Sequence, residues 1–538
     1  MKWFKNGLLS MFLVLLLTLV ACGSNDEGSQ EDTGESNNDT TSEEANNGEP
    51  SEGGTLRIAL DGQPPNLDAP TTPATSARDT SRLVFETLVT TDENFKAVPM
   101  LAESIDISDD SKVYTFHLRQ GVKFHNGKEM TAEDVIASME RWLEKSTITG
   151  TIFEGSTWTA EDDYTVVLEL AEPSSLTLDT MASAKMAAAI MPKEIVESAP
   201  PEGVEEYIGT GPYKFVEWKQ DQYIHFTKFE DYQPVSEPAS GLAGERIAYF
   251  DDIYFYIVPD ASTRLAGLQT GEYDFAYNLP YDNYDQLESN PDITTILTPS
   301  ANEFIQFNKS QGLSTNFKMR QAVNAALDNE EIMMAAFPNK DFFWLDSGYM
   351  DKHITNWAST AGSEYYNIND PELAKQYLEE AGYNGEEFRI MATRDYDHHY
   401  NAAVVIHDQL TEVGINAVLD VYDWPTFNDK FTNKLDEWDI FVVSSSTVST
   451  PPQLLALSPT FAGGVGDDKV IEMMRQIETA PSLEEAQALW DELQGYAWEE
   501  LLPIVNIGGF NSLYAVRSNV EGVTAFTGPV FWNAYFVE

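Results

Sequence analysis

Three of the seven histidines, His398, His399 and His407, lie in one short segment together with Asp395 and Asp397. Imidazole nitrogens and carboxylate oxygens are the atoms that zinc and related ions bind in proteins. His399 and His407 are spaced so that they could share one face of a helix, which makes a metal site conceivable. The alternative is the start of a helix whose polar residues are solvated, and we favour it. We therefore expect no metal and no cofactor.

Motifs for catalysis are absent from the sequence. There is no Gly-x-Ser-x-Gly elbow, no His-Glu-x-x-His zinc helix and no phosphate-binding loop, and Gly209-Thr210-Gly211 lacks the third glycine and the lysine of a nucleotide motif. Carboxylates are so numerous that any pair is weak support for acid–base chemistry. A surface-anchored hydrolase of peptides or glycans remains the alternative function, and it would need two carboxylates at a defined separation.

The charge balance excludes several partners. The 538 residues include 32 Lys and Arg against 88 Asp and Glu, for a net charge of −56. Such a surface repels nucleic acid and anionic membranes, so no nucleic-acid role is expected. It suits a saline or alkaline medium, in which salt shortens the range of repulsion. A single cysteine excludes a disulfide framework and a thiolate-rich metal site.

The N-terminal residues resemble an export signal. Lys2 and Lys5 precede an apolar run, Leu8–Val20, that is short for a membrane span. Leu19-Val20-Ala21-Cys22 resembles a bacterial lipobox, in which the cysteine is acylated and becomes the new N-terminus. We expect a lipoprotein signal peptide over 1–21, with lipid on Cys22 holding the protein on a membrane. The alternative is an ordinary secretory signal that ends near a cysteine.

Residues 22–53 favour a disordered tether, because ten of them are acidic and none is basic. From Gly53 onward the composition changes to that of a folded body. Alternating apolar residues predict strands at 55–60, 113–118, 165–170, 223–228 and 252–258. Thr131 and Asp134 predict the start of a helix. In the second half, a strand at 388–392, a helix near 399–412 and a strand at 415–421 predict a parallel crossover.

The body carries several short motifs in a fixed order. They are Gly53–Ile58, Phe85–Val89, Pro99–Ser104, Tyr114–Gly127, Thr131–Val135, Gly209–Tyr213 and Arg320–Val323. Together they resemble the family 5 solute-binding proteins, the peptide/nickel class of ABC importer receptors, from about Gly53 to the C-terminus. Any one of these motifs alone would be a weak signal, and their common order is what makes the resemblance specific.

The resemblance implies an α/β fold of the two-lobe periplasmic-binding-protein type (type II, class C), with a hinge and an extra subdomain in the first lobe. By analogy the first lobe spans 54–302 and 509–538, and the second lobe spans 303–508, with crossings at 302–308 and 504–509. Such proteins are not enzymes. They trap a small solute by hinge closure and deliver it to a permease with ATPase subunits. We expect a monomer on the outer face of the cell membrane, in a Gram-positive bacterium.

Ligand contacts should come from loops at strand ends that face the cleft. The candidates are Gln63, Tyr277, Asn278, Trp344, Arg394, Tyr396, Trp424 and Thr447. For the aromatic residues the alternative is core packing, and for Arg394 it is a surface ion pair. The segments Phe124–Gly127 and Gly209–Tyr213 should shape the first lobe and touch no ligand.

The sequence departs from the family pattern at one place. Peptide-binding members usually carry an aspartate after the strand that corresponds to Asp439–Val443, and it pairs with the α-amino group of the peptide. Here Ser446–Gln453 contains no acid, and losing a buried charge partner is costly. The resemblance therefore leaves several ligands open, among them an oligopeptide, a blocked or modified peptide, a sugar conjugate and a metal chelate.

Overall fold

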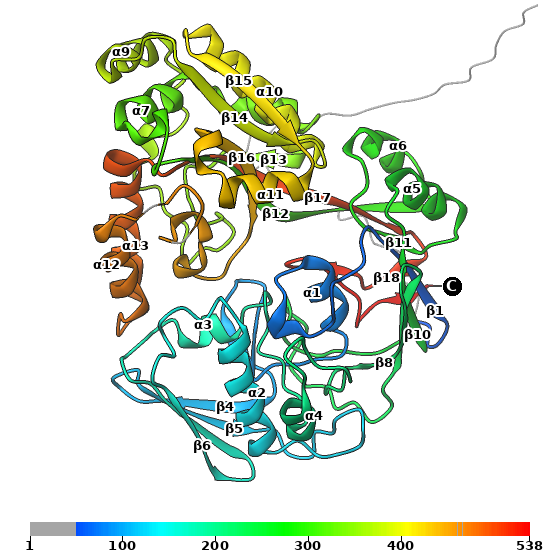
Figure 1. Ribbon diagram of the computed structural model, residues 1–538. Helices are drawn as coiled ribbons and strands as arrows, with labels where there is room; N and C mark the ends of the chain where they lie inside the picture. The colour runs from blue at the N-terminus through cyan, green and yellow to red at the C-terminus, as the bar shows by residue number, and fades with distance from the viewer. Residues whose placement is uncertain (1–49, 460, 465, 538) are drawn as a thin grey trace, which may run out of the picture. The chain divides into compact units, whose positions relative to one another are not determined.

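One large sheet of eleven strands runs through the computed structural model (Figure 1). Its strands, in order across the sheet, are β15 (Asn416–Tyr422), β14 (Glu387–Thr393), β16 (Ile440–Ser446), β12 (Ile293–Phe307), β17 (Ile504–Arg517), β11 (Phe275–Ala276), β1 (Thr55–Leu60), β10 (Asp252–Ile257), β9 (Tyr223–Lys228) and β8 (Tyr213–Lys219), with β13 (Phe343–Trp344) paired to β17 alone. The strands expected near 55, 223 and 252 are therefore confirmed.

The two longest strands lie side by side near the middle of this sheet. β12 and β17 are antiparallel, and their register runs from Ile293 opposite Arg517 to Gln306 opposite Ile504. Strands from the first half of the chain follow β17 on one side, and strands from the second half follow β12 on the other. The two crossings expected near 302–308 and 504–509 thus fall within or next to one continuous ladder, which connects both halves of the body.

The structure describes residues 50–459, 461–464 and 466–537. The signal peptide expected over 1–21, Cys22 and nearly all of the tether expected over 22–53 lie outside these residues. Among the described residues, no helix combines the length and the apolar character needed to cross a bilayer.

A smaller sheet packs against the longest helix of the first half. Its four strands, in order, are β4 (Ala102–Ile107), β5 (Val113–Leu118), β7 (Thr165–Glu169) and β6 (Thr157–Asp162). Helix α2 (Ala132–Lys145) begins at Thr131, whose side chain and that of Asp134 form the expected capping box. Val135, Met139 and Trp142 lie on the buried face of α2, so this apolar stripe holds the helix on the sheet.

The parallel crossover of the second half is confirmed. β14 and β15 pair in parallel from Glu387 opposite Asn416 onward, and α10 (Asp397–Glu412) connects them. The sequence pattern ends the strand that contains Asp439 at Val443, but in the structure Ser444–Ser446 extend it. They belong to β16 and pair with Ala301–Glu303 of β12. Backbone hydrogen bonding to a neighbouring strand decides this assignment, and serine has no strong preference that would reveal it.

The remaining helices cover the sheets and fill the second half. They are α1 (Thr75–Ser81), α3 (Thr177–Met181), α4 (Lys193–Ser198), α5 (Ala261–Thr270), α6 (Tyr284–Glu288), α7 (Phe317–Ala326), α8 (Asn329–Ala336), α9 (Pro371–Ala381), α11 (Trp424–Asn433), α12 (Asp468–Glu478) and α13 (Leu483–Tyr496). Short strand pairs complete the fold: β2 (Val89–Thr91) with β3 (Ala97–Pro99), β18 (Val520–Glu521) with β21 (Tyr535–Phe536), and β19 (Thr524–Ala525) with β20 (Pro529–Val530).

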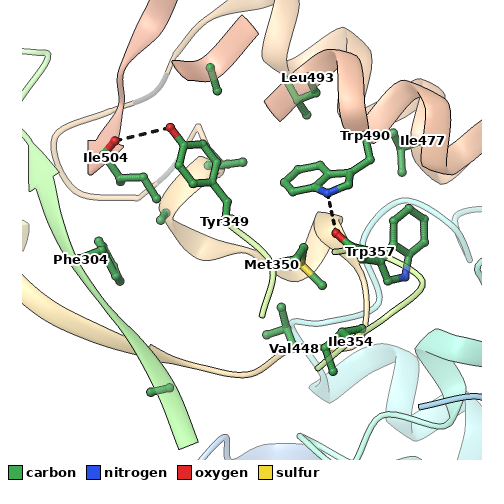
Figure 2. Close-up of a cluster of buried hydrophobic side chains, with 14 of the residues drawn as sticks. Phe304, Tyr349, Met350, Ile354, Trp357, Val448, Ile477, Trp490, Leu493 and Ile504 are labelled. Carbon is green, nitrogen blue, oxygen red and sulfur yellow. Dashed lines mark hydrogen bonds between the residues drawn. The ribbon is translucent and has the colours of Figure 1, made fainter. Parts of the chain in front are cut away.

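A buried aromatic cluster fixes the segment that follows β13. Figure 2 shows Tyr349, Met350 and Trp357 among apolar side chains from α12 and α13. The indole nitrogen of Trp490 donates a hydrogen bond to the backbone carbonyl oxygen of Trp357 at 2.9 Å. The hydroxyl of Tyr349 donates to the backbone carbonyl oxygen of Ile504 at 3.5 Å. Because both ends of this segment are buried, the residues between them are held in place.

Candidate functional site

A cavity of about 1240 Å³ opens beside the β12–β17 ladder. Its walls come from segments that are far apart in the sequence and belong to both halves of the chain. The lining includes Asp61 after β1, residues 75–79 of α1, 277–282 after β11, 298–301 of β12, 351–353, 395–399 before and within α10, 443–447 around the end of β16, and 510–514 of β17. Strand ends and the loops after them therefore supply most of the wall, as expected for an open α/β sheet.

Five of the eight predicted ligand contacts line this cavity: Tyr277, Asn278, Tyr396, Trp424 and Thr447. Asn278 adopts the left-handed backbone conformation, with φ of 40°, which asparagine tolerates better than most residues. Its amide nitrogen donates to Asp61 Oδ2 at 2.6 Å. The turn after β11 thereby ties two wall segments together.

The other three predicted contacts lie elsewhere. The side-chain oxygen of Gln63 accepts hydrogen bonds from Asp221 N at 2.7 Å and from Trp218 Nε1 at 3.3 Å, so it closes a loop against β8. Arg394 is exposed and stands outside the lining. Trp344 packs behind the wall. A Cβ on Gly509 would lie 2.2 Å from its ring, so only glycine allows this approach.

Trp344 supports two wall residues from behind. The His353 ring meets it edge-on with 4.8 Å between ring centroids, and Lys352 Nζ lies 4.9 Å from its ring centroid. Both His353 and Lys352 line the cavity. Trp344 is therefore placed one layer away from the space in which a solute would lie.

Aromatic rings form one side of the wall. Tyr396 meets Trp424 edge-on at 5.3 Å between centroids, and Trp424 stacks on buried Phe427 at 5.4 Å. Tyr396 keeps 44% of its surface exposed although its neighbours pack around it. An exposed ring held in place by buried rings offers a rigid apolar surface at little cost in side-chain entropy.

The charged side chains of the lining are mostly acidic. Seven are carboxylates, Asp61, Asp79, Glu93, Asp282, Asp351, Asp395 and Asp397, and three are Lys or Arg: Arg78, Arg264 and Lys352. Arg264 donates to four backbone carbonyl oxygens, those of Val258, Pro259, Tyr277 and Asn278. Arg78 is paired with Asp79 at 2.7 Å. Carboxylates therefore outnumber Lys and Arg in the lining by seven to three.

Asp351 is a wall residue that sequence reasoning missed. Its side chain is 3% exposed, and its Oδ1 lies 2.7 Å from His353 Nδ1. Thr447 Oγ1 donates to its Oδ2 at 3.3 Å, so a carboxylate stands beside the segment after β16 in which the sequence has no acid. Its chain neighbour Met350 belongs to the buried cluster of Figure 2, which fixes the backbone at this point. Ninety-six positions separate Asp351 from Thr447, and no local pattern connects them.

The residues that gather around His399 differ from those expected. His407 does not join His399; it is paired with its neighbour Asp408 and lies outside the lining. Asp395 accepts a hydrogen bond from the backbone nitrogen of Trp424. His398 and His399 instead meet Glu303 of β12, whose Oε2 lies 3.2 Å from His398 Nδ1 and 3.6 Å from His399 Nε2. Glu303 was not a sequence candidate, because it lies in the middle of an apolar strand.

The two glycine motifs lie away from this cavity. Residues 124–127 and 209–213 are outside its lining and contact each other. A Cβ on Gly209 would lie 2.1 Å from the carbonyl oxygen of Val84, and one on Gly211 would lie 2.5 Å from that of Leu83. The motifs therefore serve close backbone packing.

Comparisons with known proteins agree with this geometry. The family described as “Bacterial extracellular solute-binding proteins, family 5 Middle” matches residues 96–467. The chain is 29% identical to a probable peptide ABC transporter periplasmic-binding protein, y4tO, of Sinorhizobium fredii, over 89% of this chain and 93% of that protein. It is 28% identical to the oligopeptide-binding protein AppA of Bacillus subtilis, over 84% and 83% of the two chains.

Solved structures give the same fold. The binding protein AgaA of A. tumefaciens R10 in complex with agropinic acid superposes with a TM-score of 0.73 at 27% identity, over 90% of this chain and 99% of that one. AppA of Bacillus subtilis in complex with a nonapeptide gives a TM-score of 0.73 at 22% identity, over 91% and 100%. The expected two-lobe α/β fold is confirmed by these matches. The chain belongs to family 5 of the bacterial extracellular solute-binding proteins.

Proposed function

We propose that this protein is the extracytoplasmic receptor of an ABC importer, which captures a peptide-like solute between two lobes by hinge closure and passes it to the permease. The observation that carries the proposal is the cavity of about 1240 Å³ beside the ladder that joins the two halves. Sites for drug-sized molecules occupy roughly 300–1000 Å³. The larger volume suits a solute of several residues.

The lobes and the anchor are part of this proposal. The first lobe would span 54–302 and 509–538, the second 303–508, with β12 and β17 as the connection. The lipobox-like Leu19–Cys22 supports acylation of Cys22 and tethering to the outer face of the membrane. Growth with labelled palmitate tests the anchor: label should enter the wild-type protein and be absent from Cys22→Ala.

The cavity is tested with short peptides of three to five residues and mixed composition. Native mass spectrometry of the purified protein identifies any retained solute, and calorimetry with that solute or the peptides measures affinity. Trp424→Ala and Tyr396→Ala should weaken binding by at least about tenfold, since each removes part of the aromatic wall. Tyr400→Ala is the matched control, because Tyr400 on α10 is 38% exposed, close to the 44% of Tyr396, but stands outside the lining.

We further propose that Asp351 receives a cationic group of the solute. Its buried carboxylate beside Thr447 supplies the acid that the segment after β16 lacks. A free dipeptide should then bind more tightly than its N-acetylated form, and Asp351→Asn should reduce that difference. Asp491→Asn, an exposed carboxylate on α13, is the control. Equal binding of the free and acetylated forms would remove this role from Asp351.

A binding protein should release its solute unchanged. Bound peptides incubated with the protein should therefore show no cleavage by mass spectrometry. Steady turnover that disappears when one cavity residue is substituted would replace the receptor with a surface hydrolase.

A further inference from the structure

Three side chains bring metal-binding atoms together at the wall of the cavity. They are Glu303 of β12 and the consecutive pair His398 and His399 in the first turn of α10. One donor atom from each lies within 4.8 Å of the other two. Glu303 Oε2 is 3.2 Å from His398 Nδ1 and 3.6 Å from His399 Nε2. Ser444 Oγ is another polar atom nearby, 3.1 Å from His399 Nε2.

The separations of the two imidazole nitrogens from Glu303 Oε2 match the spacing of ligands around a single ion. Zinc binds nitrogen and oxygen ligands at about 2.0–2.2 Å, which places neighbouring ligands of a tetrahedral site roughly 3.4 Å apart. Two adjacent histidines would normally point to different faces of a helix. Here they sit at the helix start, and both rings reach one carboxylate.

The carboxylate of Glu303 is buried and pairs only with histidines among the described residues. Its side chain is 0% exposed, and its Oε1 has no hydrogen-bond partner among the described residues. Within the same residues its ion-pair partners are the two histidines, with no lysine or arginine. A buried carboxylate with an unpartnered oxygen and no lysine or arginine beside it is unfavourable.

We propose that Glu303, His398 and His399 bind one divalent transition-metal ion in the cavity wall. Two imidazole nitrogens and one carboxylate oxygen suit Zn²⁺, Ni²⁺ or Co²⁺, whereas Ca²⁺ and Mg²⁺ prefer oxygen ligands alone. The imidazole nitrogens supply lone pairs, and the ion supplies a positive charge beside the Glu303 carboxylate. His398 and His399 both line the cavity. An ion bound there would therefore lie beside the space in which the solute lies.

The test uses the mature protein without a histidine tag, after treatment with a chelator. Calorimetry with Zn²⁺ and with Ni²⁺, in excess Mg²⁺ to occupy the acidic surface, should show one tight site. His398→Gln should bind at least about tenfold more weakly. His407→Gln is the matched control, because it removes an imidazole from the same helix outside the cluster and should leave affinity unchanged.

Glu303 and His399 are fully buried, so their variants could fail to fold. His398 is half-buried, with a side chain 17% exposed, and its substitution keeps the decisive measurement on a folded protein. A Co²⁺ absorption spectrum gives a second measurement: the visible bands of nitrogen-bound Co²⁺ should appear in the wild type and in His407→Gln and be lost in His398→Gln. Absence of a tight site, or wild-type affinity in His398→Gln, would leave the cluster as an acid–imidazole contact. Because metal is the only probe, this result does not depend on which solute the cavity takes.

Discussion

The imidazole of His125 lies against the backbone of Gly211, with its Nε2 2.9 Å from the Gly211 carbonyl oxygen. On the other side of the ring, Nδ1 accepts a hydrogen bond from the backbone nitrogen of Gly209 at 3.3 Å. The two contacts require a neutral ring that carries its proton on Nε2. One histidine thus fastens together two of the motifs by which the family is recognised.

We expect this contact to make stability depend on pH. Burial lowers the pKa of His125 from 6.5 to about 4. The unfolded chain therefore binds more protons than the folded one between these values, and stability falls as pH decreases through that range. The loss amounts to about 3 kcal/mol when complete. Urea unfolding at pH 7.5, 5.5 and 4.5 measures it.

The variant His125→Gln isolates this contribution from other titrating groups. It should be less stable than the wild type at pH 7.5, and the difference should narrow as pH decreases, because only the wild type must keep this ring neutral. A difference that stays constant across the three pH values would show that His125 does not titrate in this way.

Gly211 cannot carry a side chain. Its Cβ would lie 2.5 Å from the carbonyl oxygen of Leu83, and its own nitrogen donates to the Val84 carbonyl oxygen at 2.9 Å. We expect Gly211→Ala to lower the free energy of unfolding by more than about 2 kcal/mol, because backbone must move to admit the methyl group. Gly62→Ala, at which nothing lies within 4 Å, is the control for thermal unfolding. Equal melting temperatures for both variants would contradict the close approach.

A buried ion pair fixes the segment after β1 to α2. Arg141 Nη1 lies 2.9 Å from Asp68 Oδ1, and its Nη2 contacts Oδ2, with side chains 6% and 0% exposed. Removing one partner leaves a buried, unpaired charge. Arg141→Met or Asp68→Asn should therefore lower the free energy of unfolding by about 3–5 kcal/mol. The double variant should lose less stability than the two single variants lose together. Urea unfolding of the wild type, both single variants and the double variant completes this double-mutant cycle. Losses of stability that simply add would mean that the two side chains are not coupled.

Local signals in the sequence were sufficient for many of the elements. Thr131 and Asp134 mark the start of α2. Asp370 accepts hydrogen bonds from the first turn of α9, and Gly382 ends that helix with φ of 70°. These signals act over three or four residues, so a single sequence displays them.

The cavity wall was predictable only in part. Tyr277 and Asn278 were found because they directly follow a strand of the sheet. Gln63 also follows a strand, but its loop turns back and its amide bonds to Asp221. Glu303 meets His398 across 95 positions, and such pairs arise from the packing of distant strands and helices. Periodicity and caps carry no information about these contacts.

The last prediction concerns a contact between the two halves of the chain, away from the β12–β17 ladder. Glu478 at the end of α12 accepts a hydrogen bond from the backbone nitrogen of Thr151 at 3.3 Å, and its other oxygen contacts the Thr151 hydroxyl. Nearby, Ser175 N donates to the Ala480 carbonyl oxygen at 2.9 Å. If capture requires the halves to close, these bonds must break before the solute leaves.

Glu478→Ala should therefore speed solute release. Losing about 1 kcal/mol of closing interactions corresponds to roughly fivefold faster dissociation. Stopped-flow fluorescence measures the dissociation rate, and small-angle scattering should show a larger radius of gyration in the solute-free variant. Glu472→Ala, exposed on the same helix, should change neither quantity. An unchanged dissociation rate in Glu478→Ala would place the step that controls release elsewhere, because the contact would then contribute nothing to closure.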